Sequence, residues 1–122
     1  MSGRTWTVLA ALSGFAAVAF GAFAAHGVEG ARAAELLRTG AHYQAVHAVA
    51  VLCAVALFGG GRAAPALFLV GTLLFSGSLY AMAFGAPGWA GMITPLGGLA
   101  LLAGWLAVAW AAWKGQRVER QA

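Results

Sequence analysis

Four apolar runs separated by short polar stretches dominate the chain. They cover about residues 6–25, 43–58, 63–84 and 91–113. A helix of about 20 residues crosses the hydrocarbon core of a bilayer, and only the second run is shorter, unless its helix begins in the polar stretch before it. The pattern predicts an all-α protein, an integral membrane four-helix bundle that forms one membrane domain over residues 1–122.

The charged residues agree with this prediction because all of them lie outside the four runs. They are Arg4, Glu29, Arg32, Glu35, Arg38, Arg62, Lys114, Arg117, Glu119 and Arg120. A charge at the centre of a spanning helix costs about 2.5–3.5 kcal/mol even on a lenient insertion scale. The chain is 62% hydrophobic and 8% charged, whereas soluble domains carry about 25% charged residues. This composition excludes a soluble domain, and the basic residues form no basic face of the kind that binds nucleic acid.

The basic residues are divided unequally between the two sides of the membrane. With four spans, the N-terminus, the loop at 59–62 and the basic tail 114–122 share one side. The basic residues of that side are Arg4, Arg62, Lys114, Arg117 and Arg120. The opposite side holds only Arg32 and Arg38. By the positive-inside rule, both termini are expected to be cytoplasmic.

A cleavable signal peptide is an alternative interpretation of the N-terminus. Arg4, the apolar stretch after it and the small-residue pattern Ala22-Phe23-Ala24 resemble one, and cleavage would leave three spans. The first apolar run is longer than the roughly 7–15 residues typical of a signal-peptide core. The length therefore favours a retained span.

Small residues recur at helical spacing in three of the runs and predict close packing of helices in lipid. The three stripes are Ala10, Gly14, Ala17, Gly21 and Ala24; Gly77, Ala81 and Gly85; and Gly97, Ala100 and Gly104. They do not say whether the neighbouring helix belongs to the same chain.

Thr72, Ser76 and Tyr80 share one face of the third run, where their hydroxyls can bond to a neighbouring helix or to their own. The fourth run carries tryptophans, which favour the membrane interface, at positions Trp105, Trp110 and Trp113.

Residues 26–42 form a polar segment between the first two runs. If residues 29–42 are helical, their polar side chains lie within about half of the helix circumference. This suits a short amphipathic segment at the membrane interface that runs into the second span, although Gly40 could break it. Two pairs spaced three residues apart would stabilise that helix weakly, namely Glu29 with Arg32 and Glu35 with Arg38.

This segment and the turn after it supply the candidate polar site, which consists of His26, Glu35, His42, Tyr43 and His47. An ionisable residue within a span is a functional candidate, but a neutral histidine bonded to a hydroxyl or carbonyl explains the same pattern. His42 and His47 lie about 140° apart around a helix, so they do not face one ion as an i,i+4 pair does. We expect neither a metal nor a cofactor.

Five short stretches along the chain form a series that is specific in combination. They are residues 21–27 (GAFAAHG), 41–48 (AHYQAVHA), 74–80 (LFSGSLY), 93–98 (ITPLGG) and 103–105 (AGW). In this order they resemble the YgdD-like family of small membrane proteins (domain of unknown function 423), whose animal relatives are called transmembrane protein 256. The chain departs from the family pattern at Ala24, where glycine is more common. The resemblance implies a four-helix protein of the bacterial inner membrane and supplies no activity or substrate.

Two functional hypotheses from different classes fit the sequence. The first is a structural or accessory protein that binds lipids, other membrane proteins or further copies of itself. The second is an oligomeric transporter or channel for a small solute or a proton, using His26, His42, Tyr43 and His47. We do not expect an enzyme, because the chain has no aspartate and no serine, cysteine or threonine in a nucleophile motif near a histidine.

Overall fold

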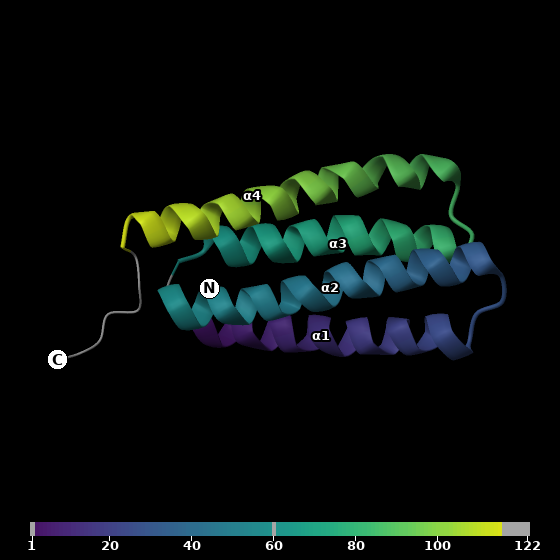
Figure 1. Ribbon diagram of the computed structural model, residues 1–122, viewed down its shortest axis with the longest axis horizontal. Coiled ribbons are helices and arrows are strands. Elements are labelled where there is room, and N and C mark those ends of the chain that lie inside the picture. The colour runs from purple at the N-terminus through teal and green to yellow at the C-terminus, as the bar shows by residue number, and fades with distance from the viewer. Residues whose placement is uncertain (1, 60, 116–122) are drawn as a thin grey trace.

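The computed structural model describes residues 2–59 and 61–115, and within them the chain forms long helices joined by short connections (Figure 1). The helices are α1 (Gly3–His26), α2 (Ala31–Phe58), α3 (Ala63–Ala83) and α4 (Ile93–Trp113), with a short 3-10 helix, η1 (Gly88–Met92), leading into α4. The first three helices and the unit made of η1 and α4 are each long and apolar enough to cross a membrane. The predicted all-α membrane fold is therefore confirmed.

The helices lie side by side in chain order, and each runs antiparallel to the next (Figure 1). α2 packs against α1 on one side and α3 on the other, and α3 packs against α4. Contacts between α2 and α4 are few, and α1 and α4 share no comparable interface. The four helices therefore form an open row, which leaves one groove between α1 and α3 and another between α2 and α4.

The N-terminus and the α2–α3 connection lie at the same end of the row as the end of α4 (Figure 1). Arg4, Arg62 and Lys114 are exposed at this end. Arg117 and Arg120, which also entered the orientation prediction, lie outside the described residues.

α2 is longer than a membrane span requires. Its 28 residues extend about 42 Å at about 1.5 Å per residue, whereas the hydrocarbon core is about 30 Å thick. The helix begins at Ala31, after Gly30 with φ 94°, and continues without a break through Gly40. The polar segment is thus mostly the first turns of α2, continuous with the second span, and Glu29 stands before the helix rather than within it.

Small residues mediate the contact between α1 and α2, as predicted. Ala10, Ala17 and Ala24 are buried. A Cβ atom placed on Gly14 would lie 3.9 Å from the Ala48 Cβ, and one placed on Gly21 would lie 3.7 Å from the Ala41 Cβ. The stripe of the first helix therefore faces a neighbour in the same chain.

The stripe of the fourth helix is confirmed at two of its three positions, whereas that of the third helix meets no other helix of this chain at Gly77. A Cβ on Gly97 would collide with the backbone of Phe75, and one on Gly104 would meet the Phe68 ring at 2.6 Å. Both glycines therefore allow α3 and α4 to approach closely. On α3, by contrast, a Cβ on Gly77 would meet nothing within 4 Å, because this residue faces a groove instead of a helix. The close contact from α3 to α4 is made at Gly71, against Leu101.

Candidate functional site

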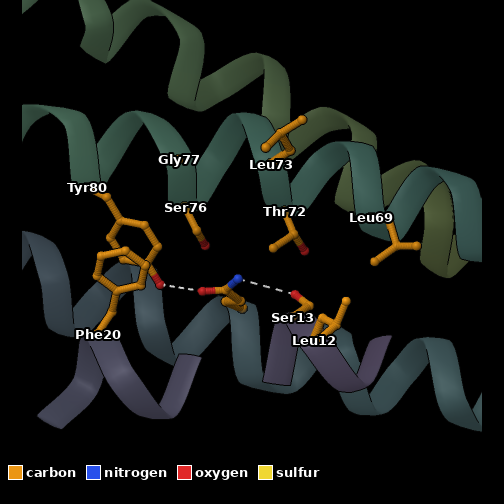
Figure 2. A pocket seen from close by; sticks show the side chains of 10 residues that line it. Leu12, Ser13, Phe20, Leu69, Thr72, Leu73, Ser76, Gly77 and Tyr80 are labelled. Atoms are coloured by element: carbon orange, nitrogen blue, oxygen red, sulfur yellow. Dashed lines mark hydrogen bonds between the residues drawn. The ribbon is translucent and has the colours of Figure 1, made fainter. Parts of the chain in front are cut away.

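A chain of polar side chains crosses three helices within the spanning region (Figure 2). The Tyr80 hydroxyl on α3 donates a hydrogen bond to Gln44 Oε1 on α2 at 2.6 Å, and Gln44 Nε2 donates to Ser13 Oγ on α1 at 3.2 Å. Ser76 adds a second link between α3 and α2, donating to the Gly40 carbonyl oxygen at 2.7 Å. We call Ser13, Gln44, Ser76 and Tyr80 the Gln44 network.

The helical repeat explains why these groups meet. Gly40 and Gln44 are four residues apart on α2, and Ser76 and Tyr80 are four residues apart on α3, so each pair shares one helix face. A Cβ on Gly40 would lie only 2.5 Å from Cε1 of the Tyr80 ring, so the glycine provides the space that this ring occupies. The ring of Phe20 on α1 stacks on the ring of Tyr80, and the two ring centroids are 3.9 Å apart. The prediction that hydroxyls of this α3 face can bond to a neighbouring helix is confirmed for Ser76 and Tyr80.

His47 links α2 to α4 across the row. Trp105 Nε1 donates to His47 Nε2 at 3.1 Å, and His47 Nδ1 lies 2.7 Å from the Tyr43 carbonyl oxygen. An indole N–H can only donate, so Nε2 must be the acceptor and the ring hydrogen must lie on Nδ1. The imidazole is 5% exposed and packs against Phe68 as well as Trp105. These two hydrogen bonds require the neutral form of His47.

Trp105 forms a contact that the prediction for the tryptophans of this helix did not include. It lies eight residues before Trp113, which places it about 12 Å further along α4 from the helix end. Trp110 and Trp113 are exposed near that end, where the Lys114 Nζ lies 5.4 Å from the centre of the Trp110 ring. Trp105, which is 46% exposed, provides the hydrogen-bond donor for the buried His47 ring.

The residues of the predicted polar site do not gather around one centre. His26 is exposed at the end of α1, and Glu35 is exposed in the first turns of α2, beside a recess of about 240 Å³ that Arg32 also lines. The rings of His42 and His47 flank that of Tyr43, with centroid distances of 5.7 and 6.2 Å. Of the five, His47 alone is buried. Among residues 2–59 and 61–115, no group of three or more His, Cys, Asp or Glu side chains is placed to hold a metal ion.

Sequence reasoning missed Gln44, Ser13 and Trp105 as members of polar contacts. A signal was present for Gln44, because a side-chain amide within an apolar run finds no hydrogen-bond partner in lipid and must find one in the protein. It also lies one helical turn after Gly40 and one residue after Tyr43. For Ser13 and Trp105 the signal was weaker, since both residues are tolerated in spanning helices without a specific partner.

Two grooves open along the row. The first, which we call the α1–α3 groove, has a volume of about 370 Å³ and is lined by Leu12, Ser13, Phe20, Gln44, Leu69, Thr72, Leu73, Ser76, Gly77 and Tyr80 (Figure 2). The second, the α2–α4 groove, has a volume of about 560 Å³ and is lined by Ala45, Val46, Val49, Ala50, Cys53, Ala54, Leu57, Trp105 and Val108. The Gln44 network borders the first groove, whereas the lining of the second is almost entirely apolar.

Comparison with known proteins identifies relatives that span nearly the same length. The family model described as "Protein of unknown function (DUF423)" matches residues 20–98. A UPF0382 membrane protein of Haemophilus influenzae is 45% identical over 119 residues, which cover 91% of this chain and 95% of the relative. The UPF0382 inner membrane protein YgdD of Escherichia coli is 40% identical over 114 residues, 86% of each chain. The UPF0382 membrane protein YwdK of Bacillus subtilis is 37% identical over 120 residues, 91% of this chain and 98% of the relative.

No solved structure matches the chain. The sequence relatives and the four apolar helices agree in describing an integral membrane protein. The chain therefore belongs to the DUF423 family, the YgdD-like family of membrane proteins that its sequence motifs resembled, whose function is unknown.

Proposed function

We propose that this protein is a non-enzymatic accessory protein of the bacterial inner membrane, and that it acts by associating with other membrane components. The observation that carries this proposal is the α2–α4 groove, an apolar concave surface that the open row of helices leaves uncovered. Within a bilayer, association depends on close packing, and small residues allow it. The floor of this groove supplies such residues at Ala45, Ala50 and Ala54.

The occupant that we propose for this groove is a helix of a second copy of the chain. Among residues 2–59 and 61–115, no charged side chain lines the groove, so an apolar helix such as those of this chain can enter it without burying a charge. Two copies inserted with the same topology are related by a two-fold axis along the membrane normal, which brings equal residues to equal depth. Cys53, the single cysteine of the chain, lines the groove and is exposed.

Self-association through this groove is expected to place Cys53 of one copy near Cys53 of the other. A short bifunctional thiol reagent applied to native membranes should therefore give a covalent dimer, measured as a doubled mass after purification. The matched control is the double variant Cys53→Ser, Val8→Cys. Val8 is 52% exposed on α1 and lies at a similar depth, about five residues from the same end of the row. It should give no dimer.

Equal dimer yields from the two cysteine positions would indicate random collision and would contradict the proposed interface. So would a Cys53 dimer that disappears when the protein is diluted in excess lipid, because a specific interface persists under conditions that abolish random encounters.

We propose further that both termini are cytoplasmic, as the basic residues at that end of the row favour. Reporter fusions at the C-terminus are expected to show cytoplasmic activity, and the purified chain is expected to have the mass of the full sequence. A periplasmic reporter signal would contradict the orientation. A chain shortened by about 24 residues would instead show that the first span is a cleaved signal peptide.

A transporter or channel for a small solute or proton is the second candidate. The observation that favours it is the presence of polar groups at membrane depth, in the Gln44 network and at His47. The hydrogen bonds at His47 favour a packing role instead, since both ring nitrogens already have partners. We therefore rank the accessory function first.

A further inference from the structure

The α1–α3 groove combines apolar walls with several uncharged polar side chains, namely Ser13, Gln44, Thr72 and Ser76, and the Tyr80 hydroxyl. Most of its lining comes from α1 and α3, with Leu12 and Leu73 among the apolar side chains (Figure 2), and Gln44 of α2 lines it as well. The Phe20–Tyr80 pair, stacked at 3.9 Å, borders one part of it. A volume of about 370 Å³ falls within the range of about 300–1,000 Å³ that is usual for small-molecule sites, which are also mostly apolar with a few placed polar groups.

Thr72 is the residue that indicates a ligand. Its side chain is only 5% exposed, and its hydroxyl oxygen is directed from α3 toward the groove (Figure 2). Within residues 2–59 and 61–115, the hydrogen bonds around the groove join Gln44, Ser13, Tyr80, Ser76 and the Gly40 carbonyl, and none includes the Thr72 hydroxyl. Acyl chains have no hydrogen-bonding atom to offer a hydroxyl that faces the groove, so an occupant with such an atom is favoured over lipid tails.

The remaining hydrogen-bonding capacity of the groove defines the chemistry of that occupant. Gln44 Nε2 carries two hydrogens, of which one is bonded to Ser13, and the Thr72 hydroxyl can also donate. The groove therefore offers donors, which select an acceptor such as a carbonyl oxygen. The part of the chain that the structure describes contributes no charged side chain to the lining, which favours a neutral occupant.

Depth distinguishes a free lipophile from a phospholipid. Gln44 lies six residues after Arg38 on α2, about 9 Å further along the helix from its charged first turns, and we take this as its depth below them. Phospholipid ester carbonyls lie at the boundary of the hydrocarbon core, above this level. The aromatic pair beside the groove provides a surface for a flat ring. We propose that the α1–α3 groove binds a neutral, lipid-soluble molecule that presents a ring carbonyl, the chemistry of a quinone headgroup, with Thr72 and Gln44 as its hydrogen-bond donors.

This proposal is independent of self-association, because the two grooves involve different faces of α2. The experiment uses the full chain, labelled with ¹⁵N, in nanodiscs of synthetic phosphatidylcholine, titrated with decyl-benzoquinone. The side-chain amide resonances of Gln44 are expected to shift and to saturate. Decylbenzene, which has the same alkyl tail and no oxygen, is expected to cause no saturable shift of these resonances.

One variant tests the Thr72 hydroxyl as a donor, and a second tests the groove as the binding site. Thr72→Val keeps the shape of the side chain and removes the hydroxyl, and we expect the affinity for decyl-benzoquinone to fall about tenfold, the equivalent of one hydrogen bond of about 1.4 kcal/mol. Gly77→Leu should abolish saturable binding by filling the groove, since a side chain there meets nothing within 4 Å. Ala81→Leu is the matched control, because Ala81 is exposed four residues later on the same helix and does not line the groove. It should bind like the unchanged protein.

Unchanged affinity in Thr72→Val, or equal binding of decylbenzene, would overturn the proposal. A shift of the Gln44 amide on changing from ester-linked to ether-linked lipids, with no quinone added, would assign the groove to a lipid ester and would also overturn it. If Gly77→Leu does not fold, the Thr72→Val comparison still decides the result.

Discussion

Replacing Gly97 with alanine is expected to destabilise the protein strongly. The added Cβ would collide with the Phe75 backbone nitrogen and would lie 2.7 Å from the Phe75 Cα and 2.8 Å from the Gly71 carbonyl oxygen. Backbone atoms inside a helix cannot move aside as the end of a flexible side chain can, so α3 and α4 must separate. Overpacking typically costs about 1–3 kcal/mol, and we expect the upper part of this range or more. Unfolding in mixed micelles of increasing dodecyl sulfate content, followed by circular dichroism, measures the loss.

The adjacent glycine provides a matched control for this experiment. A Cβ on Gly98 would lie 3.9 Å from the ring of Phe75, which is an ordinary contact distance. Gly98→Ala is therefore expected to leave the free energy of unfolding unchanged or to raise it slightly, because alanine is the better helix former. Unfolding of Gly97→Ala and Gly98→Ala at the same dodecyl sulfate content would show that α3 and α4 do not approach closely at Gly97.

Replacing His47 with leucine is expected to lower the free energy of unfolding by about 1–3 kcal/mol, because it leaves the Trp105 N–H without an acceptor between the helices. The link between α2 and α4 through Trp105 would be lost as well. In ¹H–¹⁵N spectra, the indole resonance of Trp105 should move in the direction that marks a broken hydrogen bond. A Trp105 resonance that stays in place would contradict this geometry.

His42→Leu is the control for His47→Leu, since His42 is exposed on the same helix and is expected to tolerate leucine with little change in stability.

The His47 variant also separates the two candidate functions. A transporter that uses His47 would lose its flux in proteoliposomes when the residue is replaced, whereas an accessory protein has no flux that depends on it.

The sequence determined the class of the fold because the membrane imposes its requirements locally. Each span must be apolar over its own length and free of charge, and every backbone group within it must be bonded inside the helix. These requirements are visible residue by residue, and so four spans could be predicted. That the first helix packs closely along one face was also predictable, because Gly14 and Gly21 continue one stripe of alanines at the spacing of a helix face, but its partner α2 was not.

The tertiary structure alone decided which faces meet. Lipid and protein interior are similarly apolar, so an apolar helix carries no polar face that reveals its inward side. This is why the sequence could not show that Gly77 borders a groove of this chain, and why Gly71 was not selected. It is also why the hydrogen bond from Trp105 to His47 could not be predicted.

For the polar residues, too, the sequence determined one part and the tertiary structure another. The sequence identified His47 as unusual, since it is an ionisable residue within a span, but it grouped this residue with exposed neighbours in the chain such as His42. Its actual partner is on α4, 58 positions away, and Gln44 joins residues 31 positions before it and 36 after it. Such contacts depend on the rotation and order of the helices in the row, which are fixed by packing between helices and not by the apolar character of any one of them.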